Sequence, residues 1–423
     1  VLLLGRRAWS WRSRDEPVPY GFLPFQRKDR TIKPWDQTPS GVMMANFQSS
    51  EDACPLSDFD IRFLRFSQRL RTYREANCGR CLPMIPDHDG ENGMILSRRA
   101  LMAGGVAALG LAGHAGAAVP KRTLSNPSAS AEAKALYRYL WSIYGRKTLT
   151  GQQESPGSER DELPYIEQQT GKLPAVLGLD YIHPQDNAGV NARAAEWHRS
   201  GGIASICWHW GSPEVGTGYE NSKKDFDVAR ALIPGTPQNR EMMAQMKETG
   251  ALLAKLRDQR IPVLWRPFHE FSGDWFWWGK HGPDAFKALW RLMYDTYTRS
   301  MALDNLIWVL GWAGQNVDAA YYPGRAYVDI AGADIYANDH GALAPMFGQV
   351  KQIVRDTVPI CLHENGPIPD PTLLGPTADW LWFLTWHTRW LKGADQNTVE
   401  QLRSYYASDR YLTKDELSLS KRR

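Results

Sequence analysis

The stretch PVLWRPFHE, residues 262–270, decides how this chain folds, because it is an apolar run that ends in ionisable side chains. Its first half has the β-branched and aromatic residues of a buried strand. His269 and Glu270 then follow at its end. Buried strands that end on polar groups at one common edge are typical of parallel α/β folds, which place their functional groups at the C-terminal ends of strands.

The same form recurs in PICLHENG, residues 359–366, which ends on His363 and Glu364. Eight apolar runs alternate with amphipathic stretches along the body of the chain. The runs are residues 148–151, 175–181, 203–210, 262–270, 306–312, 328–336, 359–364 and 381–386. Helices are predicted at residues 131–144, 191–200, 239–259, 284–301, 343–357 and 398–407, whereas the interval between the last two runs is the weak case.

Strand and helix in alternation predict parallel pairing with right-handed crossovers, and eight such units close into a (β/α)₈ TIM barrel. The alternative is a doubly wound open sheet. That fold commonly carries a G-x-G-x-x-G phosphate loop after its first strand, and no such loop follows residues 148–151. We therefore predict an α/β barrel as the single catalytic domain.

Charge and composition narrow the ligand class. The chain has 423 residues, is 43% hydrophobic and carries a formal charge of +4. That charge lies entirely within residues 1–117, since the remainder has 34 Lys/Arg and 34 Asp/Glu. Binding to nucleic acid or to an anionic membrane calls for clustered basic residues. The balanced body favours a neutral ligand, and we expect a monomer.

The leader contains an export signal. Residues 94–117 hold an adjacent pair, Arg98 and Arg99, then an apolar stretch, then the A-x-A pattern of residues 115–117, which is typical of a twin-arginine signal peptide. The apolar stretch is shorter than the ~20 residues that span a membrane. We expect residues 1–93 to be extra or disordered sequence, residues 118–423 to form the barrel domain, and the protein to be exported to the periplasm or secreted.

Two glutamates at the ends of strands on opposite sides of a barrel mouth can face each other across a bound molecule. Retaining glycoside hydrolysis needs such a pair, about 5 Å apart: one attacks the anomeric carbon, and the other protonates the leaving oxygen and then activates water. Glu270 and Glu364 fit this pattern. Arg266 is placed to keep a nucleophilic carboxylate ionised if it reaches the site.

Aromatic residues surround these strand ends. Trp275, Trp277 and Trp278 follow Glu270, where flat rings stack on the C–H faces of sugars. Loop packing is the other interpretation, and we expect it for one of the three.

Two other kinds of protein are alternatives to a glycosidase: a metal-dependent hydrolase and a non-catalytic binding protein. Strand-end histidines, namely His209, His269 and His363, are potential metal ligands, but there is no H-x-H on the first strand and no complete H-E-x-x-H. We therefore predict no metal and no cofactor. A non-catalytic carbohydrate-binding barrel would be favoured by loss of either glutamate, and neither is lost.

Cys207 and Cys361 each lie in an apolar run and are expected to be buried free thiols. A disulfide between them is left open.

Four motifs in order resemble glycoside hydrolase family 26. They are TGQQ at residues 150–153, CWHW at 207–210, WRPFHE at 265–270 and HENG at 363–366, and the resemblance extends over about residues 136–406. The family consists mostly of endo-β-1,4-mannanases, with some mixed-linkage β-glucanases and β-1,3-xylanases. The resemblance implies a clan A barrel with Glu270 as acid/base and Glu364 as nucleophile.

The resemblance also implies the sugar contacts. His269, Trp275 and Tyr336 are expected to line the subsite of the cleaved sugar, and His209 and Trp386 to add further contacts, although a buried position for Trp386 is nearly as well supported. The expected substrate is a neutral polysaccharide or oligosaccharide of the mannan type. The long loop of residues 211–238 is expected to decide between endo and exo action.

Overall fold

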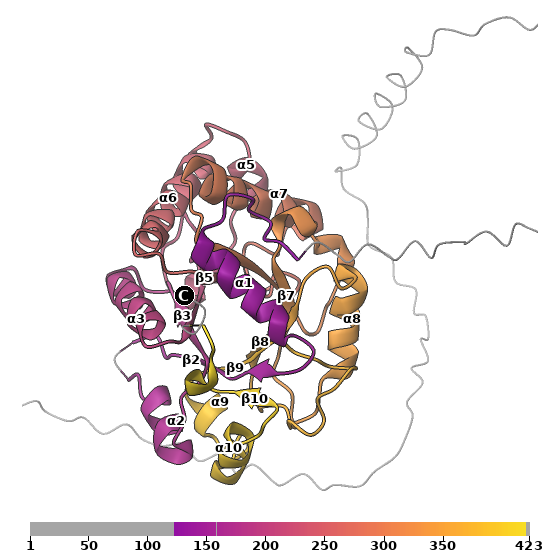
Figure 1. Ribbon diagram of the computed structural model, residues 1–423. Helices are drawn as coiled ribbons and strands as arrows, with labels where there is room; N and C mark the ends of the chain where they lie inside the picture. Colours follow the sequence, from indigo (N-terminus) through magenta and orange to yellow (C-terminus); the bar gives the residue numbers. More distant parts are fainter. Residues whose placement is uncertain (1–121, 158, 420–423) are drawn as a thin grey trace, which may run out of the picture. The chain divides into compact units, whose positions relative to one another are not determined.

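The computed structural model describes residues 122–157 and 159–419, and eight parallel strands of this part form a closed barrel in chain order (Figure 1). This confirms the predicted TIM barrel. The strands are β2 (Gly151–Gln153), β3 (Val176–Asp180), β4 (Ile203–Cys207), β5 (Val263–Arg266), β6 (Leu306–Ala313), β7 (Ile330–Ile335), β8 (Ile360–Asn365) and β9 (Phe383–Thr385).

Helices cover the outside of the barrel, but not in every interval. The α-helices that follow barrel strands are α2 (Glu162–Thr170), α3 (Asn187–Arg199), α4 (Tyr219–Ser222), α5 (Val228–Ala231), α6 (Pro237–Arg257), α7 (Gly282–Asp295), α8 (Ala344–Val354), α9 (Arg389–Lys392) and α10 (Val399–Tyr406). In the described chain, the β8–β9 connection has no helix, which agrees with the weak sequence signal there. The β6–β7 connection has only the short 3-10 turns η3 (Ala319–Tyr321) and η4 (Arg325–Tyr327).

The first predicted strand needs a correction. Residues 148–151 were expected to form one barrel strand, but they divide at Thr150. β1 (Thr148–Leu149) pairs with β10 (Tyr411–Leu412) outside the barrel, whereas the barrel strand β2 starts only at Gly151. The reason is a change of partner along the chain: the Thr150 N–H donates to the carbonyl of Leu412, while the Thr150 carbonyl accepts from Val176 of β3.

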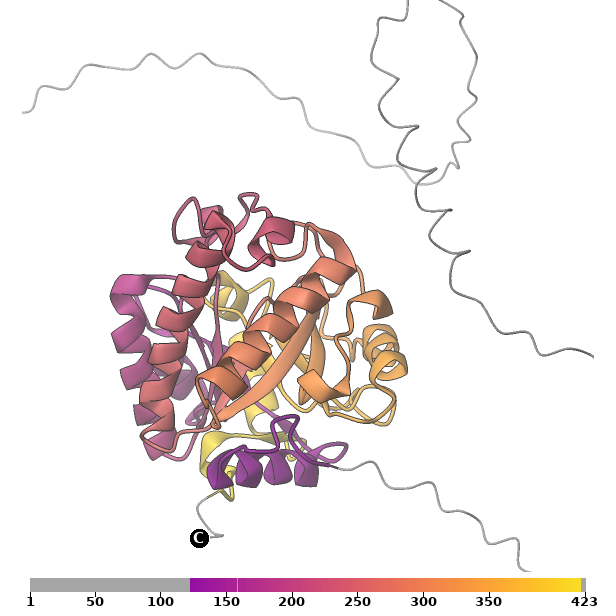
Figure 2. The same cartoon turned by 90° about the horizontal axis from the view of Figure 1, so that it is seen from above.

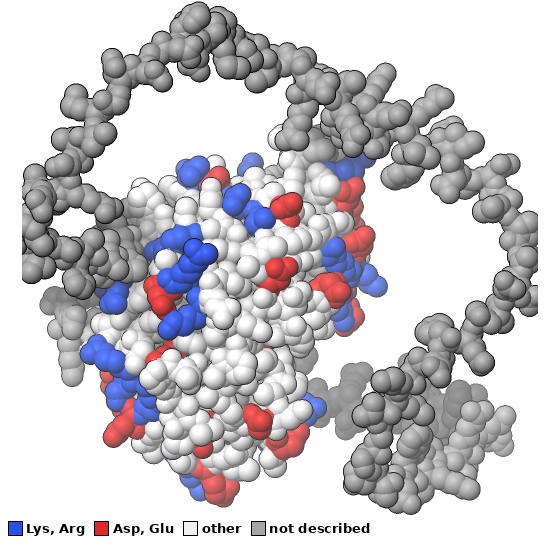
Figure 3. Space-filling model, turned by 90° about the vertical axis from the view of Figure 1, so that its right-hand side faces the viewer, with Lys and Arg blue, Asp and Glu red and all other residues white. Residues whose placement is uncertain are grey.

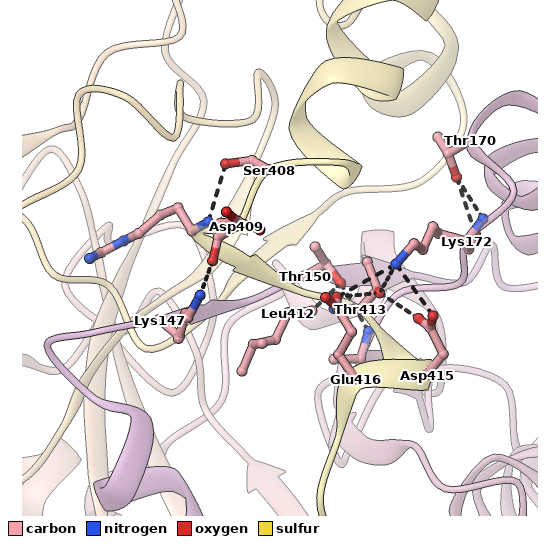
Figure 4. A network of polar contacts seen from close by, with 12 residues as sticks. Lys147, Thr150, Thr170, Lys172, Ser408, Asp409, Leu412, Thr413, Asp415 and Glu416 are labelled. Atoms are coloured by element: carbon pink, nitrogen blue, oxygen red, sulfur yellow. Dashed lines mark hydrogen bonds and ion pairs between the residues drawn. The ribbon is translucent and has the colours of Figure 1, made fainter.

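This early segment is also where the chain end is attached. Lys172, before β3, reaches Thr413 and the carboxylates of Asp415 and Glu416, at 3.5, 3.3 and 3.8 Å (Figure 4). Thr413 caps the last 3-10 turn, η5 (Lys414–Glu416): its side chain accepts from the N–H of Glu416, and its own N–H donates to Glu416 Oε2 at 2.9 Å. The network fixes the C-terminal segment against the start of the barrel.

Helix α1 (Ala131–Ile143) closes the end of the barrel where the strands begin (Figures 1 and 2). The Ser130 side chain accepts from the N–H of Ala133 and so satisfies one of the free donors of the first turn. Tyr137 donates to the carbonyl of Asp329, just before β7. The buried face of α1 shares one apolar cluster with the inward side chains of the barrel strands. The other end of the barrel, where the strands finish, therefore remains open for the functional site.

Two further findings concern the surface and the thiols. Acidic and basic side chains are interspersed among uncharged ones on the face shown in Figure 3. Cys207 and Cys361 are both free and buried, so they do not form the disulfide that the sequence left open.

No helix within the described residues is long and apolar enough to cross a membrane. The predicted leader, residues 1–93, and the twin-arginine signal, residues 94–117, lie outside the described part of the chain.

Candidate active site

Glu270 lies just beyond the C-terminal end of β5, in a backbone conformation that few side chains adopt. Its φ is +53°, in the left-handed region, and Phe268 two residues earlier has a φ of +52°. The conformation is held by neighbouring groups, since the N–H of Glu270 donates to the carbonyl of Gly311 in β6 at 2.9 Å. Trp275 Nε1 donates to Glu270 Oε2 at 2.9 Å. Uncommon backbone geometry of this kind concentrates at functional sites.

Glu364 lies at the end of β8, where a guanidinium and a hydroxyl contact its carboxylate. Arg266 Nη1 forms an ion pair with Glu364 Oε1 at 2.7 Å, and the Tyr336 hydroxyl donates to Glu364 Oε2 at 2.8 Å. Both members of the ion pair are buried. The guanidinium is a permanent cation, because the neighbouring carboxylates raise the pKa of Arg266 and outweigh the opposite effect of burial. The sequence-based expectation that Arg266 reaches the carboxylate is therefore met.

The two glutamates lie close together with different surroundings. One carboxylate oxygen each from Glu270, Asp334 and Glu364 lie within 4.8 Å of one another. Within the part of the chain that the structure describes, no Lys or Arg side chain forms an ion pair with Glu270. Burial first, and then the charge of Glu364, raise the pKa of Glu270 to about 7, and the hydrogen bond from Trp275 opposes the rise. Glu270 therefore retains its proton on a large fraction of molecules near neutral pH, opposite an ion-paired carboxylate.

A pair of histidines connects Asp180 to this centre. His209 Nδ1 contacts Asp180 Oδ2 at 2.5 Å, and its Nε2 lies 3.0 Å from His269 Nε2, which in turn is 3.9 Å from Glu364. Burial lowers the pKa of His209, but the Asp180 and Glu364 carboxylates together raise it above its usual value. His269 is held neutral, because burial and then the charge of His209 push its pKa well below the usual range. The two Nε2 atoms therefore lie within hydrogen-bond distance of each other, beside the carboxylate of Glu364.

A cleft of about 580 Å³ opens above these groups. Its volume lies in the range of ligand pockets, about 300–1,000 Å³. The residues that line it and were expected as site residues are Glu270, Glu364, His209, Trp275, Tyr336 and Trp386. Trp386 is half-buried, with its ring centroid 6.0 Å from that of His209. The structure thus places these six side chains around one cleft. Trp386, for which a buried position was a close alternative, is among them.

Three expected substrate contacts do not border the cleft. Trp278 is fully buried, and its Nε1 donates to the carbonyl of His269 at 2.8 Å. Arg266 and His269 lie in the layer beneath the cleft, each about 1% exposed. Trp277 is also buried, so two of the three loop tryptophans pack, not one. Their indole N–H groups point to backbone carbonyls, which spacing along the chain does not reveal.

Other lining residues were not singled out from the sequence. They are Pro156, Asp180, Ile182, Tyr219, Lys223, Phe276, Gln315, His387 and Trp390. Asp180 ends its strand as Glu364 does, so the strand-end rule was a sufficient signal for it. Tyr219 and Lys223 come from the long loop after β4, and Lys223 Nζ lies 4.5 Å from the Tyr219 ring centroid. The sequence pointed to this loop as a segment that could wall off one end of the cleft, and Tyr219 and Lys223 are the residues by which it lines the cleft.

Two groups of potential metal ligands occur here, one being Asp180, Cys207 and His209 and the other the three carboxylates. Each already has an internal cation. Arg266 Nη1 lies 2.7 Å from Glu364 and 3.6 Å from Asp334, and His209 contacts Asp180. These cations compete with a metal ion for the same oxygen atoms, so the donor set fits carboxylate chemistry better than metal binding.

Residues 125–416 match the family model described as Glycosyl hydrolase family 26. The chain belongs to glycosyl hydrolase family 26. The resemblance carried by the four motifs is thereby confirmed.

Curated relatives of this family 26 chain include a mannan endo-1,4-beta-mannosidase of Thermothelomyces thermophilus, 39% identical over 314 residues, which are 70% of this chain and 63% of that protein. Mannan endo-1,4-beta-mannosidase B of Piromyces sp is 34% identical over 70% of this chain and 53% of its own length. The chain therefore spans less than two thirds of these relatives.

Solved structures agree with the family assignment. A beta-mannanase from a symbiotic protist of the termite Reticulitermes speratus, complexed with gluco-manno-oligosaccharide, superposes with a TM-score of 0.66 and 31% identity, over 70% of this family 26 chain and 97% of that one. The GH26-CBM35 beta-(1,4)-mannanase of Podospora anserina gives a TM-score of 0.65 and 36% identity, over 70% and 69% of the two chains.

Proposed function

We propose that the protein is a retaining glycoside hydrolase that cleaves internal β-1,4-mannosidic bonds of mannan-type polysaccharides. The observation that carries this proposal is the pair Glu270 and Glu364, with carboxylate oxygens within 4.8 Å of each other in opposite electrostatic surroundings. That separation suits direct attack by a carboxylate, because inverting enzymes leave about 6.5–9.5 Å for a water molecule.

In the first step, Glu364 attacks the anomeric carbon while Glu270 donates its proton to the glycosidic oxygen, so that the leaving chain departs as an alcohol. Arg266 forms an ion pair with Glu364, and the Tyr336 hydroxyl donates to the same carboxylate, so both contacts hold the nucleophile in place. In the second step, Glu270, now a carboxylate, takes a proton from water, which attacks the same carbon and releases Glu364. Two displacements retain the anomeric configuration.

The substrate assignment is supported by the relatives and by the cleft. The mannanase names of the relatives favour β-mannan. Trp275, Trp386 and Trp390 offer aromatic faces beside the carboxylates, which suits the C–H faces of a neutral sugar chain. The alternative substrates within the family are mixed-linkage β-glucan and β-1,3-xylan. No cofactor takes part in the proposed steps.

The proposal is tested by reducing-sugar release by the purified protein on galactomannan, glucomannan, barley β-glucan and β-1,3-xylan in the presence of EDTA. Glu364→Ala serves as the blank, with circular dichroism to show that it is folded. We expect release from the mannans only, and short oligosaccharides of several lengths as early products. Release from β-glucan or β-1,3-xylan alone would keep the mechanism and identify that polysaccharide as the substrate in place of mannan. No release from any of the four, by a folded protein, would overturn the proposal.

Two further properties are proposed with it. We propose that the protein acts as a monomer, which light scattering of the purified protein tests. The Arg98–Arg99 pair and the apolar stretch after it support export by the twin-arginine route. Replacing both arginines with lysine is expected to leave the protein inside the cell. Unchanged secretion of this variant would contradict the route.

A further inference from the structure

Asp334 lies at the C-terminal end of β7, in the layer of buried polar groups beneath the cleft. Its side chain has an exposed fraction of 0%, and it does not border the cleft. The site described above gives it no task, although burial of an unpaired carboxylate costs several kcal/mol. The charged and titratable groups that face it come from β5, the segment after β5, β7 and β8. They are Arg266, Glu270, Tyr336, Cys361, His363 and Glu364.

Arg266 lies closer to Glu364 and His363 than to Asp334. Nη1 lies 2.7 Å from Glu364 Oε1 and 3.3 Å from His363 Nδ1, but 3.6 Å from Asp334 Oδ2. The last distance is too long for a hydrogen bond. Among the described residues, neither oxygen of Asp334 accepts a well-formed hydrogen bond.

His363 Nδ1 is shared between the two neighbours. Arg266 has only donors, so its hydrogen bond to His363 requires an Nδ1 that carries no proton. Asp334 Oδ1 closely contacts the same nitrogen. Between a proton-free nitrogen and a carboxylate oxygen there is repulsion, unless the oxygen itself carries the proton. The geometry is consistent when Asp334 is the donor.

We propose that Asp334 is a positioning residue that works as a neutral carboxylic acid: it donates a hydrogen bond to His363 and leaves the charge of Arg266 to Glu364. The proposal rests on the retaining mechanism above. Charge balance supports it, because Arg266 is a single cation beside two buried carboxylates. Burial, and then the charge of Glu364, also raise the pKa of Asp334 well above its usual range.

Kinetics of two variants distinguish a neutral from an ionised Asp334. Asn at this position keeps the shape and donates from Nδ2, whereas Ala removes the donor. We expect Asp334→Asn to keep kcat/KM on mannan within about threefold, with an unchanged pH profile, and Asp334→Ala to lose about tenfold or more, chiefly in kcat, since one hydrogen bond is worth about that factor. An ionised Asp334 predicts the reverse: Asp334→Asn would lose as much as Asp334→Ala and would shift the acid limb.

A second measurement needs no turnover, so it separates this proposal from the proposed substrate. In a Glu270→Gln background, the infrared spectrum at neutral pH should contain the C=O band of a buried carboxylic acid. Adding Asp334→Asn should remove that band. A spectrum without a carboxylic acid band, or a band that persists in the double variant, would overturn the proposal. Even if mannan proved to be the wrong substrate, the band would still report the proton on Asp334.

Discussion

Glu270 and Glu364 each follow a histidine at the end of a strand, and their different chemistry comes from their contacts. Glu364 lies 2.7 Å from the cationic Arg266 and accepts a hydrogen bond from a hydroxyl donor at 2.8 Å. Glu270 has an indole N–H as its hydrogen-bond donor and lies against aromatic rings. Two carboxyl groups whose surroundings push them in opposite directions are the requirement for an acid and a nucleophile in one site.

The activity should therefore depend on pH through Glu270. The pKa of Glu270 is raised to about 7, so the proton needed for leaving-group departure is present below that pH and is lost above it. We expect the basic limb of kcat/KM near pH 7. In Trp275→Phe the hydrogen bond that favours the ionised form is gone, so the limb should move to higher pH. A limb that stays in place in this variant would show that Trp275 does not influence the proton.

Arg266 is expected to be needed for stability as well as for activity. Arg266→Met leaves Glu364 as a buried charge without its cation, which costs about 3–5 kcal/mol in a buried pair. Urea unfolding should show this loss, and activity should fall with it. The matched control is the double variant Arg266→Met/Glu364→Leu, which removes the charge too and should recover much of the stability. Equal stability of the single and double variants would argue against the ion pair.

At the scale of elements, an irregularity between β7 and β8 brings the polar groups together. Ala333 pairs with Leu362, but Asp334 pairs with Glu364, so His363 has no partner in the ladder. A regular strand would point His363 and Glu364 to opposite faces. The bulge allows Glu364 to line the cleft while His363 contacts Asp334 in the buried layer beneath it, and such bulges re-aim side chains next to active sites.

The positions of His363 and Glu270 depend on Gly311 in β6. A Cβ at Gly311 would lie 1.6 Å from His363 Nε2, and the Gly311 carbonyl also holds the N–H of Glu270. We expect Gly311→Ala to displace His363 and Glu270 and to lower kcat by about a hundredfold, as a misplacement of about 1 Å does. Steady-state kinetics on mannan give the answer.

Gly348 in α8 provides the matched control. Nothing lies within 4 Å of a Cβ placed there. Gly348→Ala should leave kcat unchanged and raise the free energy of unfolding by about 0.5–1 kcal/mol, because alanine is the better helix former. Full activity of Gly311→Ala would contradict the close packing of β6 on β8.

At the scale of the whole molecule, the two ends of the barrel have separate tasks. Helix α1 closes the end where strands begin, and the cleft occupies the end where they finish. Leu140 in α1 is completely buried. Leu140→Ala should lower the free energy of unfolding by about 2–5 kcal/mol through loss of burial and creation of a cavity. Because Leu140 is remote from the cleft, kcat at a temperature where the variant is folded should be unchanged.

The exposed Lys134 on the same helix is the control for this variant. Lys134→Ala should change the stability by no more than about 0.5 kcal/mol, as is usual for surface substitutions. Chemical denaturation followed by tryptophan fluorescence measures both variants. A large loss of kcat in folded Leu140→Ala would show that the two ends are coupled.

The sequence by itself determined the barrel and the two glutamates. Alternation of apolar runs with amphipathic stretches is set by local burial, and residues at strand ends share one rim in any parallel barrel. Glu270 and Glu364 could be named for that reason, whereas Trp275 and Tyr336 were expected at the site from the family resemblance. The division of the first run at Thr150 could not, because it depends on a pairing with β10 more than 250 residues away.

Only the tertiary structure decided which polar and aromatic groups face the cleft and which lie beneath it. Trp278 and Arg266 look like site residues in sequence, but their partners, the His269 carbonyl and the Glu364 carboxylate, are set by packing. The nearness of Asp334 to His363 and the folding of Tyr219 over the cleft are long-range contacts of the same kind. Periodicity along the chain describes one element at a time, whereas proton positions depend on charges that several elements bring together.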